Sequence, residues 1–149
     1  MKAASLLDVN VLVALFDPDH VHHELAHDWF AEHGRHAWAT CPITENGFLR
    51  VLGNPAYGAA VGRLADLAER FSRFRASGGH LFWEDSVSLF NAGFCDWTAG
   101  VGHKQLTDIY LLALARARGG RLVTFDRSIP LRAVKGATSK HRVVVAAAE

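Results

Sequence analysis

An apolar stretch near the N-terminus ends in a carboxylate, and this feature constrains the fold more than any other in the sequence. In the segment LLDVNVLVALFD (6–17), Leu6 and Leu7 lead directly into Asp8, and Asn10 follows two residues later. Burying an unpaired charge at the end of a strand costs several kcal/mol. In an open α/β sheet, however, the carboxyl ends of the strands form the ligand crevice. We therefore interpret Asp8 as the first ligand of an acidic metal site.

The composition is that of an ordinary globular domain. A chain of 149 residues suffices for one hydrophobic core, so we expect a single domain over residues 1–149. Cys41 and Cys95 form no CxxC pair, which indicates reduced thiols. The start MKAASLLDVN does not resemble a signal peptide, and no run approaches the roughly 20 apolar residues of a membrane span. We therefore expect a soluble cytoplasmic protein.

Strand-like and helix-like segments alternate along the chain. The predicted strands are 3–8, 36–41, 80–83, 121–125 and 142–147. The predicted helices are 10–16, 20–33, 42–52, 59–76, 86–92 and 105–118, with a loop over 93–104. This alternation predicts an α/β fold, in which helices cover both faces of a parallel sheet in a three-layer α/β/α sandwich.

Two further carboxylates stand at the start of apolar helices. In PITENGFLRVL, Glu45 lies one turn before Phe48, and in QLTDIYLLALARA, Asp108 lies one turn before Leu112. An acid that heads an apolar stripe points toward the core rather than into solvent. Each also has a plain alternative: Glu45 is favoured by the helix dipole, and Thr107 or Asp108 serves as a helix cap.

A fourth carboxylate, Asp126, follows the predicted strand 121–125 as Asp8 follows the first strand. Its alternative role is to cap a short segment that begins near Ser128. Taken together, two acids at strand ends and two at helix starts gather on one edge of a parallel sheet. Four such carboxylates repel one another unless a divalent cation lies among them, and oxygen ligands select Mg²⁺ or Mn²⁺.

The order of four short motifs resembles the PIN domain family. These motifs are DVN near the N-terminus, TEN at a helix start, TD at the opening of a late apolar helix, and TFD after the next strand. The likeness is greatest to the VapC-type ribonuclease toxins of toxin–antitoxin pairs, which FLRVLGNPA after Glu45 also resembles. The resemblance covers essentially the whole chain, and it rests on the order and spacing of the motifs rather than on any single one.

The resemblance implies an architecture and a set of site residues. The implied sheet has five parallel strands in the order 3-2-1-4-5. The implied catalytic and metal-binding quartet is Asp8, Glu45, Asp108 and Asp126. Asn10 and Thr124 would then be polar groups that orient these ligands.

The resemblance also implies an activity and partners. A PIN-type toxin hydrolyses RNA phosphodiester bonds with Mg²⁺ or Mn²⁺, leaves a 5′-phosphate and inhibits translation as part of a type II toxin–antitoxin system. Its partner is a small antitoxin protein whose tail fills the site, and homodimers are common.

Basic residues gather in the C-terminal third of the chain, although the net charge is only +1. Asp126 is the one acid among eight basic residues: Arg116, Arg118, Arg121, Arg127, Arg132, Lys135, Lys140 and Arg142. Such a block is typical of a solvated face, and it also fits a surface that neutralises phosphates around an acidic centre. We predict phosphate contacts for Arg127, beside Asp126, and for Lys104, in the loop before Asp108.

One motif competes with this interpretation. His23-Glu24-Leu25-Ala26-His27 matches the HExxH signature of zinc proteases. We expect Val21, Leu25, Trp29 and Phe30 to form the core side of this helix, which leaves His23 and His27 roughly opposite, on a solvated face. A zinc protease needs its histidines in a closed cleft with a third ligand, so we favour a surface role.

Aromatic residues cluster around the predicted strand 80–83 and the loop that follows: Phe82, Trp83, Phe90, Phe94 and Trp97. We expect mainly core positions, although Phe94 and Trp97 lie in a glycine-rich segment and could stack on RNA bases or meet a partner helix. A functional alternative also stays open, namely a PIN-like scaffold that binds RNA or protein without cleaving it. A scaffold has no reason to gather buried carboxylates.

Overall fold

The computed structural model describes residues 3–58 and 62–147, and in this part of the chain all strands belong to one parallel sheet. The strands are β1 (Ser5–Leu7), β2 (Trp38–Thr40), β3 (His80–Phe82), β4 (Arg121–Thr124) and β5 (Arg142–Val144). The longer helices are α1 (Val9–Phe16), α2 (His23–Trp29), α3 (Pro42–Leu52), α4 (Leu64–Arg75) and α5 (Leu106–Ala117). The strand order β3-β2-β1-β4-β5 confirms the predicted order 3-2-1-4-5.

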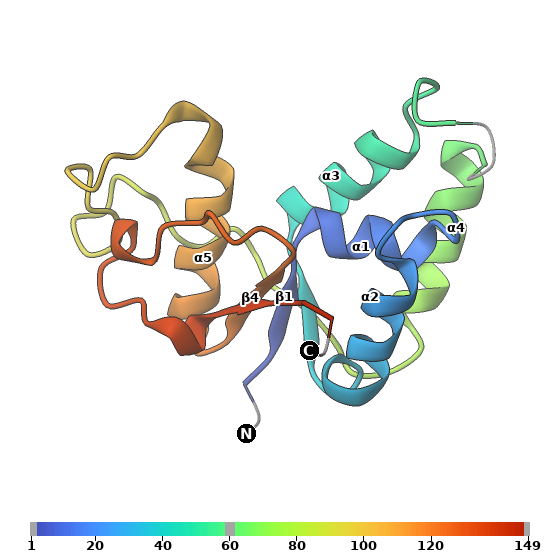
Figure 1. Cartoon of the computed structure of the whole chain (residues 1–149), viewed down its shortest axis with the longest axis horizontal. Helices are drawn as coiled ribbons and strands as arrows, with labels where there is room; N and C mark the ends of the chain where they lie inside the picture. The colour runs from blue at the N-terminus through green and yellow to red at the C-terminus, as the bar shows by residue number, and fades with distance from the viewer. Residues whose placement is uncertain (1–2, 59–61, 148–149) are drawn as a thin grey trace.

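Helices cover both faces of the sheet, which confirms the three-layer prediction (Figure 1). Helix α5 lies on one face, and α1, α2, α3 and α4 lie together on the other side. These four helices form one layer, in which α1 contacts both α2 and α3, and α3 contacts α4.

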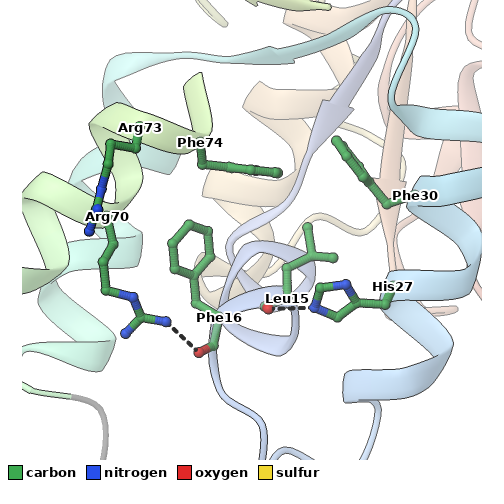
Figure 2. Close-up of a pocket in the computed structure, with 7 residues that line it drawn as sticks. All are labelled: Leu15, Phe16, His27, Phe30, Arg70, Arg73 and Phe74. Atoms are coloured by element: carbon green, nitrogen blue, oxygen red, sulfur yellow. Dashed lines mark hydrogen bonds between the residues drawn. The ribbon is translucent and has the colours of Figure 1, made fainter. Parts of the chain in front are cut away.

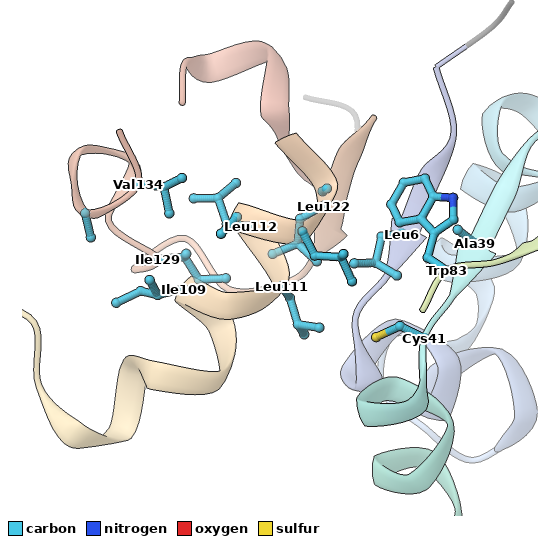
Figure 3. Close-up of a cluster of buried hydrophobic side chains, with 14 of the residues drawn as sticks. Leu6, Ala39, Cys41, Trp83, Ile109, Leu111, Leu112, Leu122, Ile129 and Val134 are labelled. Carbon is cyan, nitrogen blue, oxygen red and sulfur yellow. The ribbon is translucent and has the colours of Figure 1, made fainter. Parts of the chain in front are cut away.

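The alternation of side chains along each strand divides the core in two. Leu6 of β1 pairs in register with Ala39 and Leu122, and this row packs against the leucines of α5 (Figure 3). The next residue, Leu7, pairs with Val123 and faces α1 on the other side. Each fully buried leucine or valine contributes roughly 1.5–3 kcal/mol to folding, so the register of the sheet is fixed from both faces.

The same register sets the two strand-end aspartates side by side. The backbone N–H of Asp8 donates to the Val123 carbonyl at 2.9 Å, so the pairing of β1 with β4 continues one residue past β1. Helix α1 begins at Val9, with Asp8 as its N-cap in an extended conformation. The strand-to-helix turn therefore fixes Asp8 at the carboxyl edge of the sheet, next to Thr124 at the end of β4.

The predicted short helix over 86–92 is wrong. This segment has no regular helix; its second half forms turns, and Val87 and Leu89 pack singly against the core beside α5. The sequence offers little to hold a helix there, because Ser88, Asn91 and Gly93 favour a turn, and the Ser88 and Asn91 side chains accept from the N–H groups two residues later. The predicted loop over 93–104 is irregular as expected until a 3₁₀ turn begins at His103.

Two predicted helices begin later in the structure than in the prediction. The helix predicted over 20–33 begins at His23, and its last turn, Phe30–Gly34, widens into a π-helical turn. The start of the helix predicted over 59–76 lies partly outside the described residues; α4 begins at Leu64 and ends at Arg75. Among the helices that the structure describes, none combines the length and the apolar character that crossing a bilayer requires.

Candidate active site

Asp8 is a buried carboxylate whose two oxygens are both held by hydrogen bonds. It is 6% exposed; Oδ1 accepts from the Val9 N–H at 2.8 Å, and Oδ2 accepts from the Thr124 hydroxyl at 2.8 Å. Burial raises the pKa of Asp8 and the neighbouring charge of Asp126 raises it further, while the two hydrogen bonds act in the opposite direction. The carboxylate is thus fixed in position and poorly compensated in charge.

Thr124 connects the polar residues of the site. Besides donating to Asp8, its oxygen accepts from the Asn10 side-chain amide at 3.3 Å and from the Asp126 N–H at 3.0 Å. Asn10 Oδ1 in turn accepts from the Phe125 N–H at 3.4 Å. A hydroxyl has one proton and two lone pairs, so all three are used here. Of the two residues predicted to orient ligands, Thr124 therefore contacts both strand-end aspartates, and Asn10 contacts Thr124.

Asp126 lies in the turn that follows β4. Its Oδ1 accepts from both the N–H and the hydroxyl of Ser128, at 2.8 and 2.7 Å. These hydrogen bonds lower the pKa of Asp126, and the guanidinium of Arg142 lowers it further. The turn-capping role considered from the sequence is real, and it orients the carboxylate beside Asp8.

Asp108 brings a third carboxylate to this edge from the first turn of α5. The residue is half-buried, and its pKa is raised to about 6, first by burial and then by the charges of Asp8 and Asp126. The charges of Asp8 and Asp126 raise the pKa of Asp108, and the charge of Asp126 raises that of Asp8, which shows that the three carboxylates lie close to one another. Such a group is destabilised by its own charge unless a cation or protons compensate it.

The three aspartates share a pocket of about 440 Å³ at the carboxyl ends of β1 and β4. Its lining residues are Asp8, Val9, Asn10, Val13, His20, Val51, Tyr57, Asp108 and Asp126. The pocket lies where α/β sheets usually bind their ligands. His20, Val51 and Tyr57 were not singled out in the sequence; they reach the pocket from two loops and the end of α3.

Glu45 lies on α3, and its carboxylate is engaged with other partners. Oε2 accepts from the Thr40 hydroxyl at 2.7 Å and lies 3.4 Å from Nε of Arg75 at the end of α4. Among the described residues, the lining of the aspartate pocket does not include Glu45. The structure therefore brings three of the four predicted acids together and holds the fourth in an ion pair.

The partners of Glu45 continue into a chain of polar contacts across β2 and β3. Because the Thr40 hydroxyl donates its proton to Glu45, it accepts from Nε2 of His80, which lies 2.7 Å away. Burial and the charge of Arg75 lower the pKa of His80 to about 4, so the ring is neutral near pH 7, and donation to the Thr40 oxygen requires the tautomer with the proton on Nε2. Thr40 and His80 thus fix the orientation of the Glu45 carboxylate.

The donor chemistry of the site fits a hard divalent cation, although the three carboxylates, which share one pocket, do not converge closely enough to bind an ion as they stand. Carboxylate oxygens from Asp8, Asp108 and Asp126 are the groups that Mg²⁺ and Mn²⁺ prefer, and their mutual repulsion is what a cation would relieve. Across residues 3–58 and 62–147, no three His, Cys, Asp or Glu side chains converge closely enough to hold an ion as they stand. Cation binding would therefore require side-chain adjustment.

The two predicted phosphate contacts both lie on the surface near this edge. Arg127 directly follows Asp126, and Lys104 lies in the 3₁₀ turn before α5, four residues ahead of Asp108; both side chains are exposed. Their positions leave them available to a ligand that extends beyond the pocket. Their role in binding remains a prediction.

The HExxH segment lies at the surface as expected, with His27 exposed and His23 half-buried, but both histidines also have a structural role that the sequence did not indicate. His23 Nδ1 lies 2.6 Å from the Ala14 carbonyl, and His27 Nε2 lies 2.8 Å from the Leu15 carbonyl, so both serve the C-terminal turn of α1. Val21, expected on the core side, is 85% exposed. The last carbonyls of a helix lack partners within it, and these imidazoles supply donors to them.

A second pocket, of about 430 Å³, lies beside these histidines (Figure 2). Its lining residues are Leu15, Phe16, His27, Phe30, Arg70, Arg73 and Phe74. Figure 2 shows His27 bonded to the Leu15 carbonyl and Arg70 bonded to the Phe16 carbonyl, so three side chains satisfy the end of α1. This pocket is lined by none of the four predicted acids and is not a candidate for metal chemistry.

The aromatic cluster divides between core and surface. Trp83 is buried and Phe94 packs against the core, as expected. Phe82, Phe90 and Trp97 are 46%, 92% and 52% exposed, so the core prediction is wrong for these three. Phe90 and Trp97 lie with ring centroids 6.2 Å apart on an irregular segment.

Comparison with known proteins places this geometry in a family. The PIN domain family model matches residues 5–136. The chain is 48% identical to Ribonuclease VapC44 of Mycobacterium tuberculosis (strain ATCC 25618 / H37Rv), over 92% of this chain and 96% of that protein. It is 46% identical to Ribonuclease VapC38 of the same organism, over 84% and 86%.

Solved structures support the fold. The crystal structure of Mycobacterium tuberculosis VapC20, described as a Sarcin-Ricin loop cleaving toxin, is similar with a TM-score of 0.59 and 17% sequence identity. The likeness covers 85% of this chain and 92% of that chain. At this identity, the similarity shows the shared fold.

Proposed function

The chain belongs to the PIN domain family, and on this premise we propose that it is an endoribonuclease that requires Mg²⁺ or Mn²⁺. The observation that carries the proposal is the group of three aspartates in one pocket, where burial and then the neighbouring carboxylate charges raise the pKa of Asp8 and Asp108. A protein that only bound RNA would gain nothing from such repulsion. The ribonuclease names of relatives 46–48% identical to this chain support the same activity.

Asp8, Asp108 and Asp126 are the residues that would hold the cation. When bound, the ion would activate water for attack on a phosphodiester and would stabilise the negative charge that develops during in-line displacement. Thr124 keeps Asp8 in place, and Ser128 keeps Asp126 in place, so two of the three carboxylates are already oriented. No side-chain nucleophile is needed for this hydrolysis, whose product would carry a 5′-phosphate.

Glu45 is proposed as the fourth acid of the site. Its carboxylate is paired with Arg75, and a cation at the aspartates would compete with that guanidinium for the negative charge. The Thr40 hydroxyl donates to the same oxygen, Oε2, that faces Arg75, and His80 contacts Thr40, so these residues limit how far the carboxylate can turn. Arg127 and Lys104 are proposed to neutralise phosphates on either side of the cleaved bond.

The relatives also guide the proposal for partners. The names Ribonuclease VapC44 and Ribonuclease VapC38 support a toxin that acts on RNA and has an antitoxin partner, and we further propose that its cleavage of RNA inhibits translation. We extend the proposal to a type II toxin–antitoxin pair in the cytoplasm, in which the antitoxin's tail occupies the aspartate pocket and the toxin forms a homodimer.

The alternative function is a PIN-like scaffold without catalysis, and thermal melting separates the two. Wild type and Asp8→Asn are melted with EDTA, Mg²⁺ or Mn²⁺. A cation at 100 times its dissociation constant stabilises the native state by about 2.7 kcal/mol. We expect this stabilisation in the wild type and a much smaller one in Asp8→Asn. A wild type that melts identically in EDTA and Mn²⁺ would favour the scaffold.

A further inference from the structure

The pocket that holds the three aspartates is also lined by five residues of different chemistry, which we call its apolar end. The residues there come from α1, from the loop after α1, and from α3 with the turn that follows it: Val9, Val13, His20, Val51 and Tyr57. Val9 and Val13 are one helical turn apart and present their methyl groups from the same face of α1. One pocket therefore joins an acidic end to an apolar and aromatic end.

The Tyr57 ring lines the pocket, and a hydrogen bond to Asp17 fixes its position. Its hydroxyl donates to Oδ2 of Asp17, a carboxylate that is only 7% exposed and that also accepts from the Asp19 N–H at 2.9 Å. Burial, and then the Asp17 carboxylate, raise the pKa of Tyr57 to about 12, so the phenol remains a donor. A tyrosine ring anchored in this way presents a fixed flat surface.

His20 forms a second flat wall. Its Nδ1 accepts from the His22 N–H at 3.0 Å, and its ring lies nearly parallel to Phe125, with centroids 6.5 Å apart and an interplanar angle of 20°. Phe125 directly precedes Asp126, so this wall is tied to the acidic end. Burial and the neighbouring His22 lower the pKa of His20, which leaves a neutral ring near pH 7.

We propose that this apolar end is a subsite for one unpaired nucleobase of the RNA, adjoining the phosphate that is cleaved at the aspartates. The inference rests on the proposed nuclease function and adds to it the part of the substrate that the pocket selects. Unstacked bases bind to proteins by lying against aromatic and apolar side chains, which Tyr57, His20 and the valines provide. A volume of about 440 Å³ lies within the range of small-ligand pockets.

The chemistry favours a base over a second phosphate at this end. The valines and the neutral rings offer no positive charge, and the nearby aspartates would repel an uncompensated phosphate. Asn10 uses one of its two N–H groups on the Thr124 oxygen and one lone pair of Oδ1 on the Phe125 N–H, which fixes the amide beside the aspartates and leaves only part of its hydrogen-bonding capacity for a base. We therefore expect selection by shape and stacking, with no strict requirement for one base.

The test uses the full chain and a short single-stranded RNA, intact or with one abasic nucleotide placed at each position in turn. Cleavage is measured as kcat/KM in Mn²⁺, and binding is measured separately by fluorescence anisotropy in EDTA. The variants are Tyr57→Leu, which removes the ring, Tyr57→Phe, which keeps it, and Val51→Phe, which fills the pocket. Val21→Phe adds the same ring at a position 85% exposed and outside the pocket lining. Melting curves identify any variant that fails to fold.

The expected result is a single sensitive position next to the cut. Loss of that base should weaken wild-type cleavage and binding by about 5- to 100-fold, as for other stacked bases. Tyr57→Leu and Val51→Phe should show the same loss on intact RNA and little further loss on abasic RNA, because the two changes remove one interaction. Val21→Phe should retain the wild-type sensitivity, whereas Tyr57→Phe, which keeps the ring but loses its hydrogen bond to Asp17, should fall between wild type and Tyr57→Leu.

The two proposals fail in different ways. If the wild type cleaves RNA but abasic penalties are equal in the wild type, Tyr57→Leu and Val51→Phe, the base subsite is overturned and the nuclease stands. We define coupling as a smaller abasic penalty in Tyr57→Leu and Val51→Phe than in the wild type. If no RNA is cleaved while binding in EDTA shows this coupling, the subsite stands and the nuclease is overturned. Absence of coupling in both measurements overturns the subsite.

Discussion

The Thr124 hydroxyl donates to Oδ2 of Asp8 at 2.8 Å, although the two residues are separated by 116 positions in the sequence. The contact exists because β4 pairs with β1 in parallel, with Val123 opposite Leu7, so the residues that follow meet at the same edge. One hydroxyl therefore joins the two strand-end turns that carry Asp8 and Asp126. The candidate site depends on this junction.

Removal of the Thr124 hydroxyl should weaken both folding and cleavage. Thr124→Val preserves the shape but leaves Asp8, Asn10 and the Asp126 N–H without their shared partner, which should cost about 1–3 kcal/mol of unfolding free energy. Thr124→Ser retains the hydroxyl and should lose much less. Urea denaturation gives the free energies, and RNA cleavage gives the activity. Equal losses in the two variants would show that the methyl group matters rather than the hydrogen bonds.

The Asp108 charge should destabilise the protein when no cation is present. Its pKa is raised to about 6 in the folded state from a usual value of 3.8. Between these two values the folded state binds more protons than the unfolded state, so stability falls as pH rises from about 4 to about 6. Asp108→Asn should lack this decline, melt higher than wild type in EDTA at pH 7, and fail to cleave RNA. An Asn variant that melts lower in EDTA would contradict the proposed repulsion.

His80 should act in the opposite direction over much of the same pH range. Its pKa is lowered to about 4 from 6.5, so the unfolded state binds more protons between these values. The stability that the neutral ring contributes is present above pH 6.5 and is lost as pH falls toward 4. His80→Gln preserves a donor for Thr40 without titrating, and should remove this loss. Because Asp108 and His80 oppose each other, each slope is measured as the difference between wild type and variant in EDTA.

The histidines of the HExxH segment should matter for stability and not for metal chemistry. His27→Ala removes a donor from the Leu15 carbonyl at the end of α1, which should cost about 0.5–1.5 kcal/mol. Cleavage by the folded variant should remain near the wild-type level. His36→Ala, at a position that is exposed like His27 but lies outside this contact, is the matched control for loss of an imidazole. A loss of cleavage that zinc restores would revive the zinc interpretation.

The sheet could be predicted because each of its strands is short, apolar and followed by a recognisable helix or polar turn. The positions of Asp8 and Asp126 also follow from the sequence, since each directly follows a strand and those strand ends share an edge. The resemblance to the PIN family supplied the strand order. These predictions were possible because the strand patterns are local and because the carboxyl ends of neighbouring parallel strands meet at one edge of the sheet.

Other features depend on contacts that no local pattern encodes. Tyr57 and His20 reach the aspartate pocket from loops that are far apart in sequence, and Tyr57 is anchored by Asp17. Glu45 was placed correctly on α3, but its ion pair with Arg75 arises only when α4 packs beside α3. The exposed Val21 departs from the predicted helical stripe because α2 begins two residues later, at His23.

The most direct test of the account is cleavage of total cellular RNA by the purified protein in Mn²⁺, in Mg²⁺ and in EDTA, beside Asp8→Asn. We predict discrete fragments with 5′-phosphate ends in the two metals, and intact RNA in EDTA and with the variant. The variant should still bind RNA, because the exposed side chains of Arg127 and Lys104 are unchanged. Equal cleavage in EDTA and by Asp8→Asn would contradict the assignment of the aspartates as the site, and intact RNA under every condition would contradict the nuclease itself.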